Sequence, residues 1–218
     1  MTKIAMSWSS GKDSAACLSK LLSDGHPVDC LLTTVTKDYD RVSMHGVRSE
    51  LLNQQALALG LPLKILDIPS QCSNDIYQAK MSDMISQLQK DGFSQVAFGD
   101  LFLEDIRAYR EQHMKDTGIE PIFPLWGLNT RDLSRQLIQK GYKCIVSCTD
   151  PRKVPDNLCG SDYDLEFLES LPDNVDPCGE NGEFHTFITD GPDFKFPVHV
   201  KRGQKVIRGG FCFMDLTL

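Results

Sequence analysis

The chain has 218 residues, of which 41% are hydrophobic and 24% are charged, and its formal net charge is −7. This length and composition are typical of a globular protein that buries a sizeable core. The acidic balance argues against broad nucleic-acid binding, because such binding needs a basic face that displaces phosphate counterions.

The cysteines and the N-terminal segment predict a cytoplasmic protein. The eight cysteines contain no Cys-x-x-Cys pair and lie scattered through apolar stretches, as the reduced thiols of cytosolic proteins do. No signal peptide is visible at the start of the chain. No segment contains the roughly 20 apolar residues that a membrane span requires.

Short β-type runs alternate with helix-type segments up to Asp150, which predicts a parallel, doubly wound α/β sheet. The expected strands are 3–8, 28–36, 63–68, 95–98 and 144–147. The expected helices are 14–23, 47–59, 74–90 with Asn74 as its N-cap, 104–115 and 130–139. Residues 121–126 should be extended because two prolines forbid a helix there. Gly25, Gly60 and Gly141 are expected to end the helices that precede them.

The composition changes after Asp150. Prolines, glycines and aspartates are dense through 150–191, apart from one short helical segment near 164–170. The segment 196–218 reads as two strands joined around 202–204. These features predict a smaller C-terminal α+β unit, and we divide the chain into domains 1–127 and 128–218.

The loop Ser9–Ser14, between the first expected strand and helix, has the composition of an anion site. Backbone N–H groups at a helix start lack acceptors, and the helix dipole adds partial positive charge there. Small residues let a phosphate approach closely, Lys12 adds a full charge, and the hydroxyls of Ser9 and Ser14 are donors. Asp13 is expected either to hold Mg²⁺ or to orient Lys12.

Several interpretations of this loop compete; its residues are Ser9, Ser10, Gly11, Lys12, Asp13 and Ser14. The Walker A pattern fails twice, because Met6 and Asp13 stand where it requires glycine and a hydroxyl residue. The Ser-x-x-Lys motif of penicillin-binding proteins fits, but its companion boxes are missing. If the loop were only an ordinary helix N-terminus, capping would give no reason for a lysine among its small residues. The ATP-pyrophosphatase loop S-G-G-K-D-S agrees at five of six positions, with Ser10 replacing a glycine. A serine is tolerated there unless the backbone needs a positive φ.

The ATP-pyrophosphatase pattern predicts a particular chemistry. A loop that grips the β- and γ-phosphates of ATP leaves the α-phosphorus open to attack by a carboxylate oxygen. Pyrophosphate then leaves with its charge already neutralised by the loop and Mg²⁺. We therefore expect ATP and Mg²⁺ to be bound and an acceptor to be adenylylated.

A second dense cluster of polar side chains lies in residues 176–187. Gly179 and Gly182 predict a tight loop. The side chains that this loop would present toward one region are Glu180, Asn181, Glu183 and His185. A polar turn before an edge strand is the alternative interpretation.

Three other positions follow expected strands, where α/β sheets place nucleotide contacts: His45, Gly99 and Asp100. An exposed loop histidine and a helix-capping or turn aspartate are the alternatives. Arg107 and Arg110, one helical turn apart, either face an acidic ligand or belong to a solvated helix surface.

Together these segments closely resemble the diphthine–ammonia ligase family, a branch of the N-type ATP pyrophosphatases with an adenine nucleotide alpha hydrolase-like fold of the HUP type. The signature Gly-Glu-Asn-Gly-Glu-Phe-His-Thr matches residues 179–186, and the loop Ser9–Ser14 matches the phosphate loop. Met44-His45-Gly46 and Pro124-Leu125-Trp126 resemble two further family segments. The resemblance covers most of the chain.

The resemblance implies an activity. Family members use ATP to activate a carboxylate as an acyl-adenylate, and ammonia then displaces AMP; the eukaryotic and archaeal substrate is the diphthine side chain of elongation factor two. By analogy Glu180, Asn181, Glu183 and His185 line the acceptor or ammonia side. Glu183 would bind ammonium and take its proton. On this basis 1–127 is the nucleotide domain and 128–218 the substrate side. Eukaryotic members carry extra C-terminal domains, so this chain resembles the short archaeal or bacterial form. A homodimer is a further expectation.

Three other functions stay open. In a bacterium, diphthamide would not be the product, and the substrate would be another carboxylate, a corrinoid-salvage intermediate or an adenine nucleotide cleaved by hydrolysis. A tRNA-modifying adenylylating enzyme is disfavoured because neither paired catalytic cysteines nor a basic appendage is evident. A non-catalytic ATP or AMP sensor is disfavoured by the presence of Lys12, Asp13 and the Glu180–His185 cluster.

Overall fold

A mainly parallel sheet forms the first half of the chain in the computed structural model, which describes residues 2–218. Its parallel strands, in the order β4-β2-β1-β5-β6, are β4 (Leu63–Ile68), β2 (Cys30–Thr36), β1 (Lys3–Ser7), β5 (Phe93–Ala97) and β6 (Glu120–Ile122). The short strand β3 (Arg41–Val42) pairs antiparallel with the end of β2, just after the 3-10 turn η1 (Lys37–Tyr39).

Helices cover both faces of this sheet, because side chains of the central strands alternate between two apolar layers. Ile4 and Met6 of β1 share one core with the helices α1 (Lys12–Ser23) and α2 (Ser49–Leu59). Ala5, between them, belongs to the opposite core. That core is closed by α3 (Asn74–Lys90) and α4 (Glu104–Met114). The doubly wound α/β prediction is confirmed.

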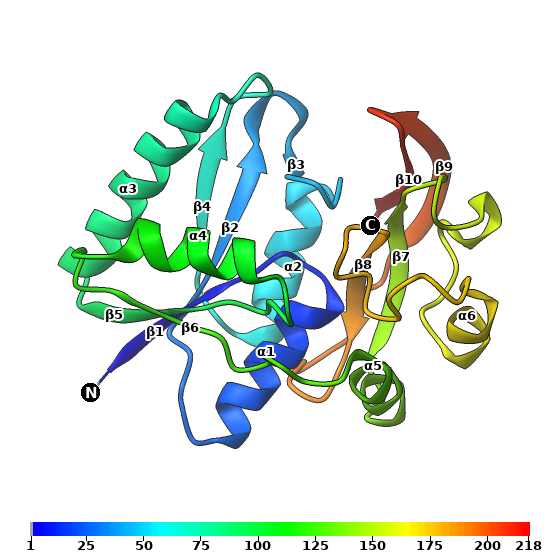
Figure 1. Cartoon of the computed structure of the whole chain (residues 1–218), viewed down its shortest axis with the longest axis horizontal. Coiled ribbons are helices and arrows are strands. Elements are labelled where there is room, and N and C mark those ends of the chain that lie inside the picture. Colours follow the sequence, from blue (N-terminus) through cyan, green and yellow to red (C-terminus); the bar gives the residue numbers. More distant parts are fainter. Residues whose placement is uncertain (1) are drawn as a thin grey trace.

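An antiparallel sheet forms most of the second half and stands beside the first sheet (Figure 1). Its strands, in the order β8-β7-β10-β9, are β8 (Phe184–Asp190), β7 (Lys143–Thr149), β10 (Phe211–Thr217) and β9 (Lys201–Arg208). The helical segments of this half are α5 (Thr130–Gln139), η2 (Asp156–Leu158) and α6 (Leu165–Ser170). The smaller C-terminal α+β unit is therefore present as predicted.

The two halves meet where α1 packs against β8, and one buried side chain spans the join. Gln55 of α2 accepts a hydrogen bond from Trp8 Nε1 (2.8 Å) and donates to the carbonyls of Ser10 (3.1 Å) and Ile188 (2.7 Å). The N–H of Ile188 on β8 in turn donates to the same Ser10 carbonyl (2.9 Å). The loop after β1 is thus fastened to the second sheet as well as to the first.

Local expectations were mostly confirmed at helix ends. Gly25, Gly60 and Gly141 follow α1, α2 and α5 with φ of +80°, +70° and +83°, a conformation that suits glycine. The N-cap of α3 is Ser73, whose hydroxyl accepts the Ile76 N–H, and Asn74 is already helical. The expectation for Asn74 was therefore wrong by one residue.

The joint between the last two strands was misplaced. Residues 202–204 lie inside β9, and the turn is made by Gly209 and Gly210. Both glycines have positive φ (+59° and +83°), as a tight two-residue hairpin requires. A Gly-Gly pair between apolar runs was the stronger turn signal.

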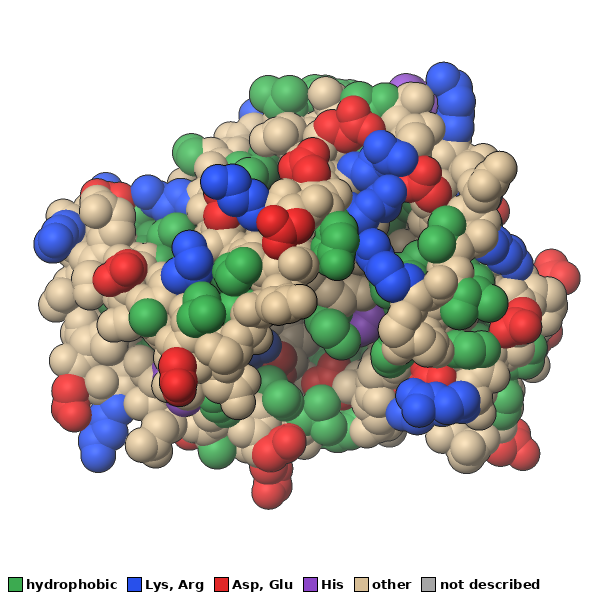
Figure 2. Space-filling model, turned by 90° about the horizontal axis from the view of Figure 1, so that it is seen from above, with side chains coloured by type: hydrophobic (Ala, Val, Ile, Leu, Met, Phe, Trp, Pro, Cys, Tyr) green, Lys and Arg blue, Asp and Glu red, His purple; other side chains and the backbone are tan. Residues whose placement is uncertain are grey.

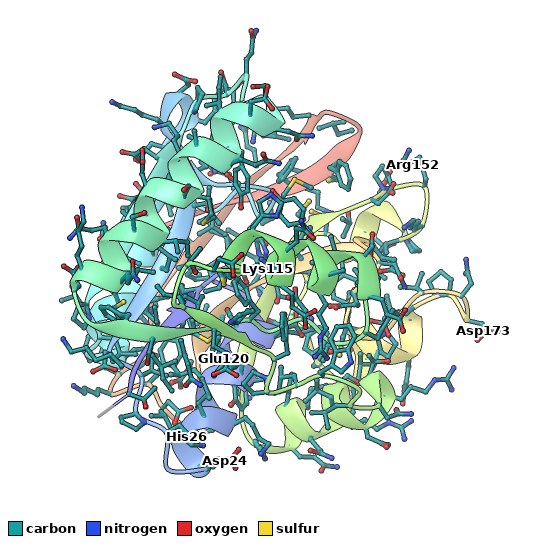
Figure 3. The ribbon with its side chains drawn as sticks, turned by 60° about the vertical axis from the view of Figure 1, so that its left-hand side comes forward. Asp24, His26, Lys115, Glu120, Arg152 and Asp173 are labelled. Atoms are coloured by element: carbon teal, nitrogen blue, oxygen red, sulfur yellow. The ribbon has the colours of Figure 1, made fainter. Side chains whose placement is uncertain are left out.

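Charged side chains that the site does not use project from the periphery. Asp24 and His26 lie in the exposed turn after α1, while Arg152 and Asp173 mark the outer edge of the second half (Figure 3). Within residues 2–218, none of the helices has both the length and the apolar character needed to cross a membrane.

Candidate functional site

A cavity of about 480 Å³ opens at the carboxyl ends of the parallel strands, within the size range of small-molecule sites. Its walls come from the segments that follow β1, β3 and β5 and from the 178–186 segment of the second half. Figure 2, which views the molecule from above, shows a hollow in the surface with histidine and acidic side chains visible inside it. The position agrees with the rule that ligands of open α/β sheets bind outside the carboxyl ends of the strands.

The loop Ser9–Ser14 forms part of the cavity floor, and two of its residues shape the backbone. Ser10 is fully buried with φ of +73°, so the position does require the left-handed conformation that a serine tolerates poorly. Its hydroxyl has no hydrogen-bond partner. Gly11 precedes α1, and a Cβ there would lie 3.0 Å from the Thr186 carbonyl oxygen. The N–H of Lys12 donates to Thr186 Oγ1 (3.1 Å). Close contact with β8 therefore explains the glycine.

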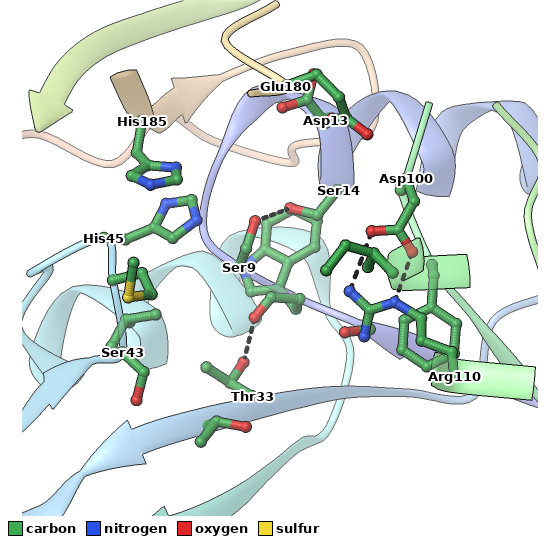
Figure 4. Close-up of a pocket in the computed structure, with 18 of the residues that line it drawn as sticks. Ser9, Asp13, Ser14, Thr33, Ser43, His45, Asp100, Arg110, Glu180 and His185 are labelled. Atoms are coloured by element: carbon green, nitrogen blue, oxygen red, sulfur yellow. Dashed lines mark hydrogen bonds and ion pairs between the residues drawn. The ribbon is translucent and has the colours of Figure 1, made fainter. Parts of the chain in front are cut away.

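Ser9, Asp13 and Ser14 line the cavity at the start of α1. The Ser9 hydroxyl is 3.3 Å from that of Ser14, which donates to the Gly11 carbonyl (Figure 4). First-turn N–H groups of a helix have no acceptor within the helix and attract anions. Burial raises the pKa of Asp13, and the neighbouring Lys12 ammonium opposes that rise. This end of the cavity can hold a phosphate.

Lys12 belongs to the loop but does not line the cavity. Its side chain is 1% exposed, and its ammonium donates to both carboxylate oxygens of Asp13 (2.8 and 3.0 Å) and to the Cys178 carbonyl. The structure therefore places the lysine beneath the loop, between the two halves of the chain.

Gly99 and Asp100 meet the same loop from β5. A Cβ on Gly99 would lie 3.0 Å from the carbonyl oxygen of Asp13, so glycine allows the segment to pack against the start of α1. Asp100 accepts two hydrogen bonds from Arg110 (2.6 and 3.0 Å), whose guanidinium lies 4.1 Å from the Phe98 ring centroid. Asp100 and Arg110 both line the cavity.

Arg107, the other arginine considered on α4, is not part of this wall. Its guanidinium lies 4.8 Å from the Trp126 ring centroid and pairs with Glu111 (2.8 Å). The two arginines on one helix therefore have different surroundings, and only Arg110 reaches the cavity.

His45 and His185 face each other on the opposite wall, with ring centroids 4.4 Å apart (Figure 4). His45 Nδ1 is 3.4 Å from the Thr186 carbonyl. Burial lowers the pKa of His185 to about 4, and the Lys12 charge adds to this effect. Burial and the neighbouring His185 hold the pKa of His45 well below its usual value. Both rings are therefore neutral near pH 7.

The four polar side chains expected to gather in one region do not all do so: they are those of Glu180, Asn181, Glu183 and His185. Glu180 and His185 line the cavity, whereas Asn181 is exposed and Glu183 is 2% exposed. Glu183 Oε1 accepts from the Asp176 N–H (3.2 Å) and from Asn181 Nδ2 (3.1 Å), so this carboxylate holds the loop itself. The expectation that these side chains gather on one region holds for only two of them.

Glu180 has an unusual carboxyl group. Its Oε1 accepts the Leu101 N–H (2.7 Å), and burial raises its pKa to about 7. Asp13 and Asp100 add to the rise, because negative charges nearby disfavour ionisation. A carboxyl group poised near neutrality at a cavity wall can exchange a proton under physiological conditions.

Some residues in and beside the site carried little sequence signal. Gln55 is a buried amide in the middle of an apolar helix, and its three hydrogen bonds set the loop position. Tyr77 and Met81 of α3 also line the cavity. A polar residue on the buried face of α2 was the one available hint for Gln55.

Two family models match the chain. A model described as the diphthamide synthase N-terminal domain matches residues 1–121, and one described as the diphthamide synthase C-terminal domain matches residues 129–217.

Similar curated proteins carry one name. A diphthine–ammonia ligase of Rattus norvegicus is 25% identical, with 99% of this chain and 89% of the relative covered. The Homo sapiens protein of the same name is also 25% identical, over the same shares of both chains. The protein of Danio rerio is 24% identical, over 94% of this chain and 89% of its own. Coverage of 89% leaves no room for a large additional domain, so the expectation that eukaryotic members carry extra C-terminal domains is wrong for these relatives.

Proposed function

Because the chain belongs to the diphthamide synthase family, we propose that it is an ATP-dependent ligase that joins ammonia to a carboxylate by way of an acyl-adenylate. One observation carries the proposal: the N-terminus of α1 and the carboxyl group of Glu180 face the same cavity from opposite halves of the chain. A phosphate site and a titratable group thus lie around one space. In this proposal 1–127 binds the nucleotide and 128–218 supplies the acceptor side, with diphthine as the substrate that the relatives' name suggests.

The phosphates would be held at the start of α1. The donors nearest there are the first-turn N–H groups of Asp13 and Ser14 and the hydroxyls of Ser9 and Ser14. These two hydroxyls donate to Ser14 Oγ and to the Gly11 carbonyl, and they would turn toward a bound phosphate. Asp13 is the carboxylate nearest to them along the chain. Mg²⁺ commonly takes one or two protein carboxylates together with substrate phosphates, so Asp13 fits a magnesium ion bound with the nucleotide. The ion would neutralise charge on the departing pyrophosphate.

The proposed reaction has two balanced steps. A carboxylate oxygen of the acceptor attacks the α-phosphorus of ATP, and the bond between that phosphorus and the oxygen bridging to the β-phosphorus breaks, releasing pyrophosphate. Ammonia then attacks the acyl carbon, the carbon–oxygen bond to AMP breaks, and the nitrogen loses a proton. The cavity supplies donors for the first step and a proton acceptor for the second.

Glu180 is the best-placed group for the nitrogen side. A pKa near 7 lets its carboxylate bind ammonium and then accept a proton. Neutral His45 and His185 can accept or donate hydrogen bonds without repelling ammonium. Glu183, the residue favoured from sequence, is reassigned in this proposal to holding the loop that carries Glu180.

Product analysis tests the proposal. The protein is incubated with ATP, Mg²⁺, ammonium chloride and a protein substrate that carries diphthine, and AMP, ADP and the modified side chain are separated. We expect AMP and pyrophosphate in equal amounts, with an amide on the acceptor. ADP would contradict α-phosphate chemistry, AMP without an acceptor would indicate a nucleotide hydrolase, and tight binding without products would indicate a sensor. Glu180→Gln should bind ATP normally and form little amide.

A further inference from the structure

Three acceptor oxygens surround the Lys12 ammonium inside the protein. An ammonium group carries three donors. Two acceptors are the carboxylate oxygens of Asp13, at 2.8 and 3.0 Å, and the third is the carbonyl oxygen of Cys178. Because this side chain is 1% exposed and does not line the cavity, a direct contact with a phosphate would require the ammonium to move away from these acceptors.

Aromatic rings of the second half complete the surroundings of this ammonium. Its nitrogen lies 5.4 Å from the ring centroids of both Tyr163 and Phe184, within cation–π distance. The Tyr163 hydroxyl donates to the Pro177 carbonyl (2.8 Å), one residue before Cys178. Lys12 therefore projects from the first helix into a cage that belongs to the C-terminal half.

Cys178, whose carbonyl accepts from Lys12, is part of a hydrogen-bonded turn. Asp176 Oδ2 accepts the N–H groups of Cys178 (3.2 Å) and Glu180 (3.0 Å), and the Gly179 N–H donates to the Asp176 carbonyl (2.8 Å). The backbones of Cys178 and Glu180 are thus linked through the same Asp176 carboxylate. Glu180 then reaches the cavity wall, where its carboxyl group accepts the Leu101 N–H.

We infer that Lys12 is a positioning residue, which anchors the turn carrying Glu180 to the start of α1 and does not grip the nucleotide phosphates. An apolar residue would fill the same space without the cost of desolvating a charge, so the charge is there for the link it makes. The inference deepens the proposed function and rests on it, because it concerns how the ammonia side is aligned with the phosphate side of one cavity.

A comparison of ATP with AMP distinguishes a Lys12 that grips the outer phosphates from a Lys12 that only positions the turn. We compare Lys12→Met with Lys20→Met, the same change at an exposed lysine on the same helix. Calorimetry with ATP and with AMP should give dissociation constants within about threefold of the parent protein for both variants. If Lys12 gripped the outer phosphates, Lys12→Met would weaken ATP by about 10- to 100-fold and leave AMP unchanged, which would overturn the inference.

Turnover distinguishes positioning from a purely structural role. Below its melting temperature, Lys12→Met should lose at least about tenfold in kcat for amide formation, with KM for ATP unchanged. Because Lys12 acts through Glu180, the double variant Lys12→Met/Glu180→Gln should be no slower than Glu180→Gln alone. Additive losses, or an unchanged kcat in Lys12→Met, would contradict the inference. A parent protein that neither binds ATP nor forms AMP would instead contradict the proposed function.

A second variant keeps the test open if Lys12→Met does not fold. Tyr163→Phe removes only the hydroxyl that ties Pro177 of the same turn. It should lower kcat without changing the affinity for ATP. Full turnover in Tyr163→Phe would show that the attachments of this turn do not govern Glu180, and the inference would fall.

Discussion

The imidazole rings of His45 and His185 lie 4.4 Å apart on one wall of the cavity, although one comes from the loop after β3 and the other from β8. The contact brings two bases together in a buried place. Protonating either ring would put a charge beside the other ring and near Lys12, so the pair is kept neutral.

Replacing His185 should change how the free energy of unfolding depends on pH. Its pKa falls from 6.5 to about 4 on folding, so the stability it contributes is present above pH 6.5 and is lost as the pH falls through about 4. As the pH falls from 6.5 to 4, the free energy of unfolding should therefore decrease less in His185→Asn than in the parent protein. The difference between the two decreases should be at most about 3 kcal/mol. Urea titrations across this pH range measure the difference, and parallel curves for the two proteins would contradict it.

Glu180→Gln should change the pH dependence of stability in the direction opposite to His185→Asn. The Glu180 pKa rises from 4.5 to about 7, so its favourable contribution is complete below pH 4.5 and is lost as the pH rises through about 7. As the pH rises between these values, the variant should gain stability relative to the parent protein. Because solvent screens the partly exposed carboxyl group, the gain should stay below the roughly 3 kcal/mol that the full shift would give. Denaturant unfolding at pH 4.5 and pH 7.5 checks this. A constant difference at both values would mean that the carboxyl group titrates normally in the folded protein.

The sheet and the phosphate loop were predictable because local patterns specify them. Alternating strand and helix runs indicated the parallel sheet, and small residues with Lys12 before a helix indicated the loop. The direction of a side chain within a loop has no such pattern. Glu183 and Lys12 are polar residues of the kind that line cavities, but both are turned inward. Glu183 bonds to Asp176 within its own loop, and Lys12 bonds to Cys178 in the other half of the chain.

The Asp100–Arg110 pair shows the same limit. Each residue was a separate candidate in the sequence, and their pairing depends on α4 folding back over the end of β5. The joint between β9 and β10 differs, because the Gly209–Gly210 pair is itself a local turn signal, stronger than the single glycine at 203.

Opposite substitutions at adjacent loop positions should have opposite effects. Ser10→Gly removes a left-handed serine and a buried hydroxyl without a partner, so we expect about 1 kcal/mol of added stability after the entropy cost of glycine. Gly11→Ala places a Cβ 3.0 Å from the backbone oxygen of Thr186, which cannot move without displacing β8. It should lose about 1–3 kcal/mol and weaken ATP binding.

Thermal unfolding and ATP titration of both loop variants check these expectations. Ser10→Gly should melt about 2–4 °C higher than the parent protein, as a gain of this size implies for a chain of this length, and its affinity for ATP should be unchanged. A lower melting temperature in Ser10→Gly would show that the serine hydroxyl has a partner in solution that offsets the backbone strain.

Gln55 should be the most sensitive position outside the cavity. It is fully buried, and Gln55→Leu keeps its volume while leaving Trp8 Nε1 and the Ile188 carbonyl without this partner. Unpaired buried groups cost about 1–3 kcal/mol each, so we expect a loss of about 2–4 kcal/mol in urea unfolding. ATP affinity should fall as well, because the Ser10 carbonyl loses one of its two attachments.

The neighbouring residue provides the control for Gln55. Gln54→Leu makes the same change on the same helix at a partly exposed position, so it should stay within about 0.5 kcal/mol of the parent protein. The contrast isolates the bridge from any effect on helix propensity, since both variants replace glutamine by leucine one residue apart. If the two variants lost equal stability and bound ATP alike, the three hydrogen bonds of Gln55 would not be what fastens the phosphate loop to β8. The attachment would then rest on the Ile188 N–H bond to the Ser10 carbonyl, the Lys12 N–H bond to Thr186 Oγ1 and the packing of α1 against β8.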